Sequence, residues 1–226
     1  MKYYSNYTNT EENYLKAIYK LSEISNDGIS TNAIAARLDT KAASVTDMLK
    51  KLDKKKLISY KKYQGVTLTQ EGERIAILII RKHRLWEYFL VQKLNFKWDE
   101  VHEVAEQLEH IKSKLLVDKL DEYLGNPKYD PHGDPIPNVE GKIRNLHTTT
   151  ALQLKKGETG VVVGVKDHST SFLQHLDALG VALGKKILVK DSIKYDQSLL
   201  VDLDKHTDIT LSKKVSENLF IERELK

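Results

Sequence analysis

The chain has 226 residues, of which 40% are hydrophobic and 30% charged, and a net charge of +4. This is the composition of a folded globular protein. It contains no cysteine, which excludes disulfide scaffolds, thiolate metal sites and cysteine nucleophiles. Its apolar runs are shorter than the ~18 residues of a membrane span, and its polar N-terminus is unlike a signal peptide. We therefore expect a cytoplasmic protein without a membrane partner.

Residues 1–72 carry the pattern of a winged helix-turn-helix, a fold that binds DNA. Thr10, followed by two glutamates, predicts the N-cap of a first helix. A short alanine-rich helix is expected over 31–38, and another over 41–54, where apolar residues recur three and four apart. Two short strands on either side of Gly65 then predict a hairpin, which would be the wing.

The segment from 41 to 62 is strongly basic, with eight lysines against two aspartates. Such a segment suits an anionic polymer, although a merely solvated lysine-rich face would have the same composition. Small and polar residues at the start of the expected helix would approach base edges, and the lysines would contact phosphates. The residues predicted to bind DNA are Lys41, Ala43, Ser44, Thr46, Asp47, Lys50, Lys51, Lys61 and Lys62.

Residues 73–144 are expected to be helical and to form a dimer surface. Thr69 predicts the cap of a long helix that ends near Leu94, and a second helix is expected from Asp99. A third is expected over 115–124. The proline-rich segment over 126–138 cannot be a helix or a central strand, so it is predicted to be a rigid loop.

From 145 to 226, short alternating runs replace the helical periodicity. Apolar and β-branched runs at 160–165, 186–189 and 199–203 predict strands of a small β-barrel. The predicted fold class is therefore mainly α with a small β domain. The expected domains are 1–72, 73–144 and 145–226.

Histidines and glutamates recur three and four residues apart in two segments of the expected helical domain. They are His83, Glu87, His102, Glu106, Glu109 and His110. Residues at this spacing share one face of a helix, so packing the two helices together would gather three carboxylates and three imidazoles. A divalent cation is the simplest way to neutralise such a cluster. A single pair of this kind would also suit a solvated helix surface.

Four short motifs follow one another through the helices and the proline loop. They are Arg81-Lys82-His83-Arg84-Leu85, Val101-His102-Glu103, Leu108-Glu109-His110 and Pro131-His132-Gly133. Together with the winged module they resemble the diphtheria-toxin-repressor family of iron and manganese regulators. The tail from Leu152 resembles that family's C-terminal SH3-like, FeoA-type domain. The resemblance covers nearly the whole chain and implies a metal-activated repressor that binds palindromic double-stranded DNA as a homodimer.

The resemblance also implies two metal sites. The residues implied for the first are His83, Glu87, His102, Asp130, His132 and His168. Those implied for the second are Asn13, Glu106, Glu109 and His110. His168 stands where the family usually has a carboxylate, and Asn13 offers only a neutral oxygen. Because every donor is nitrogen or oxygen, we expect Mn2+ or Fe2+, with Mn2+ slightly preferred.

Two alternatives remain open at this point. A di-metal hydrolase or oxygenase could use the same cluster, but it would need an open coordination position and a substrate pocket, and it leaves the lysine-rich module unexplained. A DNA-binding protein with a purely structural metal would carry the same motifs, and metal titration of operator binding would separate it from a sensor. We therefore expect a transcriptional regulator rather than an enzyme.

Overall fold

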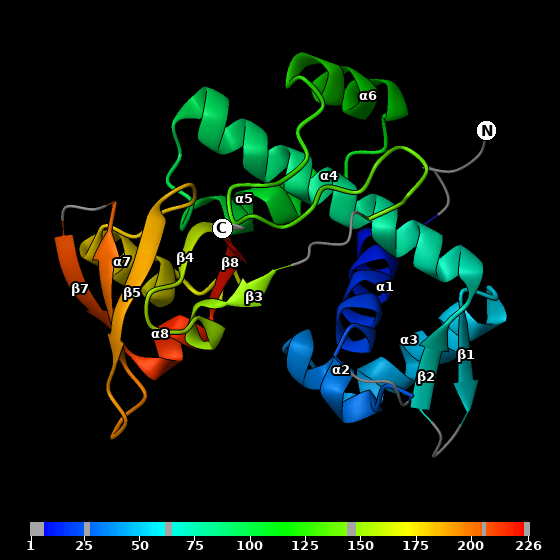
Figure 1. The fold of residues 1–226 in the computed structure, drawn as a ribbon. Helices are drawn as coiled ribbons and strands as arrows, with labels where there is room; N and C mark the ends of the chain where they lie inside the picture. Colours follow the sequence, from blue (N-terminus) through cyan, green and yellow to red (C-terminus); the bar gives the residue numbers. More distant parts are fainter. Residues whose placement is uncertain (1–6, 25–27, 62–64, 144–147, 205–206, 224–226) are drawn as a thin grey trace. The chain divides into compact units, whose positions relative to one another are not determined.

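The computed structural model describes residues 7–24, 28–61, 65–143, 148–204 and 207–223. In these ranges helices dominate the first half of the chain and strands the second (Figure 1), which confirms the predicted fold class. The chain forms two compact units. The first comprises Met1–Trp86, Ala105–Asn126 and Pro137–Ile143, and the second comprises Glu87–Val104, Pro127–Ile136 and Arg144–Lys226. The division into domains at 1–72, 73–144 and 145–226 stays a prediction.

The first helix, α1 (Asn9–Ser22), begins two residues earlier than the sequence indicated. Its N-cap is Thr8, so the prediction of Thr10 was wrong. The hydroxyl of Thr8 accepts a hydrogen bond from the amide of Glu11 at 3.2 Å, and the carboxylate of Glu11 accepts one from the amide of Thr8 at 3.0 Å. This reciprocal pair satisfies two backbone donors that would otherwise lack partners, whereas Thr10 lies inside the first turn.

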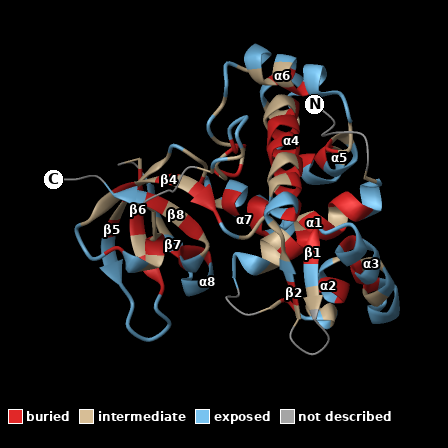
Figure 2. Cartoon of the chain, turned by 90° about the vertical axis from the view of Figure 1, so that its right-hand side faces the viewer, coloured by how far each residue is buried: buried red, intermediate tan, exposed pale blue. Residues whose placement is uncertain are grey.

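The winged helix-turn-helix is confirmed. It consists of α2 (Thr31–Arg37), α3 (Ala42–Lys54) and an antiparallel hairpin of β1 (Ile58–Lys61) and β2 (Gly65–Leu68). The inward face of α3 is formed by Val45, Leu49 and Leu52, which are completely buried together with Leu15 and Ile18 of α1. In Figure 2 the helices of this module are coloured as partly buried and partly exposed. The opposite face of α3 is exposed.

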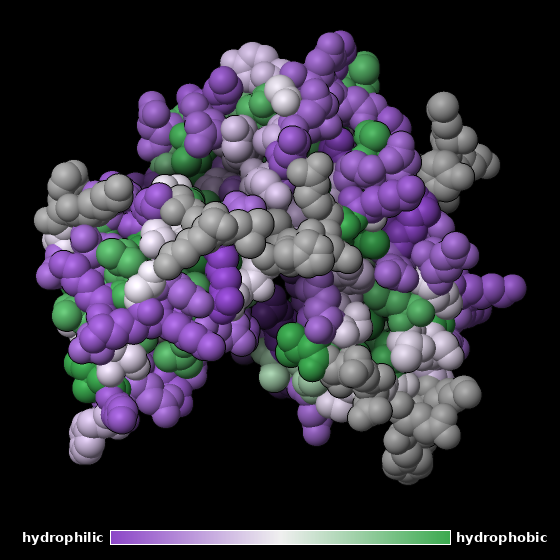
Figure 3. Space-filling view, viewed as in Figure 1, coloured by the Kyte–Doolittle hydropathy of each residue, from purple (hydrophilic) through white to green (hydrophobic). Residues whose placement is uncertain are grey.

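The predicted long helix is α4 (Gln70–Leu94), and the amide of Gly72 donates to the side chain of Thr69, which caps it. Two shorter helices follow, α5 (Val101–Leu108) and α6 (Lys114–Tyr123). No helix in the described ranges is long and apolar enough to cross a bilayer. On α6, Leu115 and Tyr123 are 70% and 66% exposed, and Figure 3 shows hydrophobic side chains between hydrophilic ones over this helix.

The C-terminal part of the second unit is a six-stranded antiparallel sheet in the order β3-β8-β4-β5-β6-β7. Its strands are β3 (Thr149–Thr150), β4 (Thr159–Val165), β5 (Lys186–Ser192), β6 (Leu199–Leu203), β7 (Thr207–Leu211) and β8 (Leu219–Arg223). The three predicted strands are β4, β5 and β6. The sequence missed β3, β7 and β8, because they are short or lack a clear apolar alternation.

Alternate residues of β6 and one face of a helix form the core of this domain. Leu199, Val201 and Leu203 of β6 point into it, where they meet Leu173 and Leu176 of α7 (Thr170–Leu179). The domain also contains a single turn of 3-10 helix, η1 (Ala151–Gln153), and a short α-helix, α8 (Lys213–Glu217). The strands nearest to α7 therefore have a fixed register, since a slip by one residue would turn their apolar side chains outward.

The cap of α1 can be tested with two matched threonine variants. We expect Thr8→Ala to lower the free energy of unfolding by about 1 kcal/mol, because the amide of Glu11 loses its acceptor. Thr10→Ala, an equally exposed position inside the helix, should cost less than about 0.5 kcal/mol. Urea denaturation followed by circular dichroism measures both. Equal losses for the two variants would contradict the assignment of Thr8 as the cap.

Candidate metal centre

Three buried ligand residues converge in the second unit. Glu87 lies on α4, and Asp130 and His132 lie on the proline-rich loop after α6; their ligand atoms are within 4.8 Å of one another. Only 2%, 4% and 1% of these residues is exposed, respectively. We call them the Glu87 cluster. Two carboxylates are costly to bury unless a positive charge neutralises them.

The ring of His132 is oriented as a metal ligand would be. Its Nε2 lies 2.8 Å from the carbonyl oxygen of Trp98, and a carbonyl can only accept, so Nε2 carries the hydrogen. In the neutral ring, Nδ1 therefore presents a lone pair. This buried atom has no hydrogen-bond partner in the described part of the chain, and Glu87 Oε2 is 3.7 Å away, too far for a hydrogen bond.

The surroundings of His132 favour positive charge. Burial alone lowers the pKa of His132, but the carboxylates of Glu87 and Asp130, with the carbonyl of Trp98, outweigh it and raise the pKa to about 9. At 3.7 Å the carboxylate of Glu87 acts through its charge rather than through a hydrogen bond. Nδ1 of His132 and the carboxylates of Glu87 and Asp130 can thus share a proton or bind a metal ion. A donor set of one nitrogen and two carboxylates suits a hard divalent cation.

The loop that carries Asp130 and His132 is held by its own turn and by β4. Asp130 Oδ1 accepts hydrogen bonds from the amides of His132 at 2.8 Å and Asp134 at 3.0 Å, which fixes the orientation of the carboxylate. The amide of Val165 on β4 donates to the carbonyl of His132 at 2.9 Å. Gly133 has a φ of +87°, and a Cβ there would lie 2.0 Å from the carbonyl oxygen of Val163.

Two further predicted ligands lie near the Glu87 cluster. His102 on α5 is half-exposed, and its Nδ1 is 3.4 Å from Glu87 Oε1. His83 precedes Glu87 by one turn of α4, so both project from the same side of that helix. Of these two predicted ligands, His102 therefore contacts the buried carboxylate of Glu87, and His83 lies one helical turn before it.

His168, the remaining histidine implied for the first site, lies flat against His132. The two ring centroids are 4.7 Å apart and the planes differ by 19°. Its Nε2 is 3.2 Å from the carbonyl oxygen of Val165, and its pKa is lowered, mainly by burial. His168 is not among the converging ligand atoms found in the described residues. It packs on the ring of a ligand candidate, and its role as a ligand stays a prediction.

A second group of charges lies in the first unit. Glu109, fully buried, accepts from Lys16 Nζ at 2.7 and 2.9 Å and lies 2.6 Å from Nδ1 of His83. Lys16 Nζ is also 3.3 Å from Glu106 Oε1. We call these four residues the Lys16 cluster. Burial alone would raise the pKa of Glu109, but His83 and Lys16 outweigh it and lower the pKa.

The second metal site stays a prediction, but the structure shows which side chain of α1 meets His110. Nδ1 of His110 is 2.6 Å from Glu12 Oε2, so the acidic partner from α1 is Glu12 and not its neighbour Asn13. Glu12 and Lys16 were both missed. The signal that could have found them is their i, i+4 spacing on α1, which brings a charge of each sign to one side of this helix.

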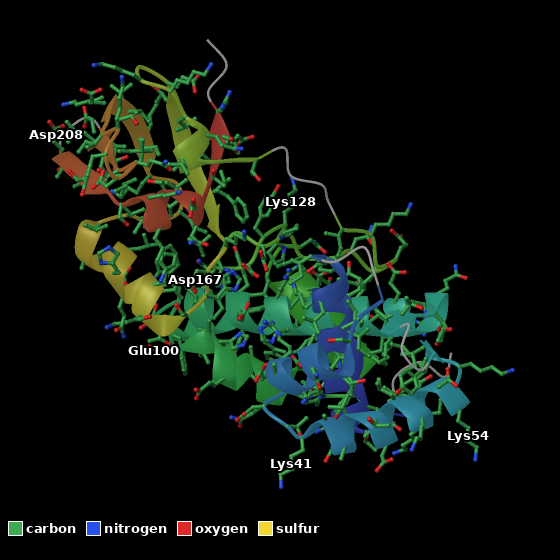
Figure 4. The ribbon with its side chains drawn as sticks, turned by 90° about the horizontal axis from the view of Figure 1, so that it is seen from below. Lys41, Lys54, Glu100, Lys128, Asp167 and Asp208 are labelled. Carbon is green, nitrogen blue, oxygen red and sulfur yellow. The ribbon has the colours of Figure 1, made fainter. Side chains whose placement is uncertain are left out.

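The residues predicted to bind DNA lie mostly on the outer face of α3. Lys41 and Lys54, at the two ends of this helix, project away from the ribbon in Figure 4. The exposed positions among the predicted set on this helix are Ala43, Ser44, Asp47, Lys50 and Lys51.

Four of the predicted DNA-binding residues have partners within the protein. The hydroxyl of Thr46 donates to the carbonyl of Ala42 in the preceding turn. Lys50 pairs with Asp47 at 3.2 Å, and Lys51 Nζ lies 3.1 Å from the buried carboxylate of Glu11. Lys62 and the side chain of Lys61 lie outside the described residues.

Three family models match consecutive parts of the chain. Residues 6–66 match the N-terminal DNA binding domain of iron dependent repressors, residues 69–138 match their metal binding and dimerisation domain, and residues 149–223 match the FeoA domain. A solved manganese-dependent transcriptional repressor in complex with manganese is 31% identical, with a TM-score of 0.83 over 95% of this chain and 100% of that one. The chain belongs to the iron-dependent repressor family.

Other relatives agree. The structure of the manganese regulator SloR is 31% identical, with a TM-score of 0.73 over 95% of this chain and 98% of that chain. The iron-dependent repressor IdeR of Mycobacterium leprae is 26% identical over 95% of this chain and 97% of its own length. IdeR of Mycobacterium bovis is 35% identical over 132 residues, which span 58% of this chain and 56% of that protein. These relatives are repressors, which confirms the expectation of a regulator rather than an enzyme.

The contact between the loop and β4 can be tested with two glycine variants. Gly133→Ala and Gly157→Ala both place a side chain at a φ near +85°, but only the first meets other atoms, because nothing lies within 4 Å at Gly157. The shared strain costs about 1–2 kcal/mol. Because of the clash with β4, we expect Gly133→Ala to lower the free energy of unfolding, measured by urea denaturation, by a further ~1–3 kcal/mol. Equal losses would show that the loop yields easily and does not depend on β4.

Proposed function

We propose that this protein is a metal-activated transcriptional repressor that binds palindromic double-stranded DNA as a homodimer, with Mn2+ or Fe2+ held by the Glu87 cluster. The observation that carries the proposal is Nδ1 of His132, which is buried, has no hydrogen-bond partner in the described residues and lies among two buried carboxylates. His102 and His83 supply further nitrogen ligands from α5 and α4. A bound ion would supply the positive charge that these carboxylates require.

The choice of metal follows from the donor atoms. The cluster contains carboxylate oxygens and imidazole nitrogens and no sulfur, so it favours Mn2+ or Fe2+ on hardness, and we propose Mn2+ as slightly preferred. Later metals bind such donors more tightly in the Irving–Williams order. In agreement, structures of one relative, ScaR, are described with Zn2+ and with Cd2+.

Charge neutralisation explains how ligand binding would control the protein. A metal ion held by both Glu87 and Asp130 would join the loop to α4, the helix that follows the wing directly in the chain. We propose that this restraint selects the orientation in which two winged modules of a dimer match successive major grooves.

The DNA interface that we propose is the outer face of α3 with the wing. Ser44 and Thr46 would read base edges, and Lys41 and Lys50 would contact phosphates on either side. Lys51 keeps 51% of its side chain exposed despite its contact with Glu11, so it stays in the proposed interface. Acting on DNA, the protein would work in the cytoplasm.

We propose that α6 contributes to the dimer surface. Leu115, Leu116 and Tyr123 are exposed on this helix, and exposed apolar residues that gather on one element are characteristic of protein interfaces. The helix lies within residues 69–138, which match the metal binding and dimerisation domain of the family.

The first prediction from this function is that DNA affinity requires both metal and Glu87. In fluorescence anisotropy with a palindromic operator, excess Mn2+ should tighten binding by about 5–150-fold relative to chelator. Glu87→Gln should abolish most of this gain, because one charged ligand is lost. The matched control is Glu217→Gln, whose exposed carboxylate pairs with Lys213 on α8. Equal affinity of the unsubstituted protein in chelator and in Mn2+ would contradict the proposal.

A second prediction separates contacts that recognise the DNA sequence from contacts with the charged phosphates. Lys50→Ala should weaken binding to all DNA sequences alike and reduce the salt slope by about one, because a phosphate contact is lost. Ser44→Ala should instead change the preference among operator variants with little change in the salt slope. Lys213→Ala, an exposed lysine of α8, is the control. If Lys50→Ala altered only the sequence preference, the assignment of these two residues would be reversed.

A further inference from the structure

The Lys16 cluster already contains a cation. The ammonium of Lys16 lies 2.7 and 2.9 Å from the two carboxylate oxygens of Glu109 and 3.3 Å from Glu106 Oε1. Glu109 is fully buried and the side chain of Lys16 is only 17% exposed. We propose that this ammonium permanently replaces the second metal ion implied by the family resemblance, so that each chain takes one regulatory ion, at the Glu87 cluster.

The ammonium of Lys16 already occupies the carboxylate oxygens that a metal ion would use. A lysine ammonium has three donors, and here they meet both oxygens of Glu109 and one of Glu106. A divalent ion placed between the same carboxylates would be within a few ångströms of this positive charge, where repulsion in a partly buried site amounts to several kcal/mol. The ion would have to displace Lys16 or go elsewhere.

The histidines near this cluster are also engaged by carboxylates. Nδ1 of His83 is 2.6 Å from Glu109 Oε2, and Nδ1 of His110 is 2.6 Å from Glu12 Oε2. At these distances Nδ1 donates its hydrogen to the carboxylate oxygen, so a metal ion could use only Nε2 of these two rings. In the Glu87 cluster it is instead Nδ1 of His132 that is buried without a hydrogen-bond partner in the described residues.

The residue types on α1 support the same conclusion. Asn13, which the resemblance implies as the fourth ligand, is neutral, and Lys16 one turn later is positive. Relative to a carboxylate at 13, this helix brings less negative charge to the site, and it adds a cation of its own. The acidic partner that α1 does provide, Glu12, is bound to His110.

A built-in cation has a consequence for regulation. Leu15 and Ile18, which flank Lys16 on α1, are buried in the core shared with α3. The contact of Lys16 with Glu109 therefore ties the DNA-binding module to the residues after α5 in the presence or absence of metal. Metal control is then confined to the Glu87 cluster, and this part of the inference rests on the proposed function.

The experiment is to count tightly bound Mn2+ per full-length chain, by titration with electron paramagnetic resonance detection of the free ion. We expect one ion for the unsubstituted protein and two for Lys16→Met, which keeps the length of the side chain and removes its charge. Lys16→Arg should still bind one. The control is Lys20→Met, one turn further along α1, where the lysine pairs only with an exposed glutamate in the described structure.

A second set of variants separates the two clusters. Glu87→Gln should bind no tight ion, and the double variant Lys16→Met with Glu87→Gln should bind one, at the newly opened cluster. Retention of the single ion by Glu87→Gln would contradict the proposed function. A single ion in folded Lys16→Met, or two ions in the unsubstituted protein with one lost in Glu109→Gln, would overturn the inference about Lys16. This last comparison decides the question even where Lys16→Met does not fold.

Discussion

Glu87 and His132 are both almost completely buried, and their facing atoms, Oε2 and Nδ1, are 3.7 Å apart with no hydrogen bond between them. Two neighbouring residues of the second unit hold His132 in this position. The carbonyl of Trp98 fixes which nitrogen of His132 carries hydrogen, and the ring of His168 covers its face. A buried charge held so rigidly cannot relax by turning toward water, and this makes the position responsive to a cation.

The two charge clusters satisfy one electrostatic requirement in different ways. In each, buried carboxylates need positive charge nearby. At the Lys16 cluster the chain supplies it through an ammonium on α1, and this contact depends on no external ion. At the Glu87 cluster the carboxylate of Glu87 faces two imidazoles, that of His102 at 3.4 Å and that of His132 at 3.7 Å. In our proposal the first contact forms with or without metal, whereas the second responds to a bound ion.

The winged module relies on a similar use of one acidic residue. Glu11 completes the capping box of α1 with Thr8, and the same carboxylate lies 2.7 Å from Lys55 and 3.1 Å from Lys51. Burial would raise the pKa of Glu11, but the lysines and the amide of Thr8 outweigh it and lower the pKa. The start of α1 and the end of α3 are therefore held by one group, so the proposed recognition helix is positioned by α1.

The sequence by itself determined the elements and most of the ligand candidates, because both depend on spacing. Apolar periodicity defined α3 and α4, and the i, i+4 pairs marked His83, Glu87 and His102. Only the tertiary structure decided the partners. Lys16 and Glu109 are 93 residues apart, and Glu12 rather than Asn13 meets His110, because the rotation of α1 against α5 is set by packing. Nor could a sequence pattern show that Nδ1 of His132 is buried without a hydrogen-bond partner in the described residues, since the orientation of a ring follows from the carbonyl that its other nitrogen meets.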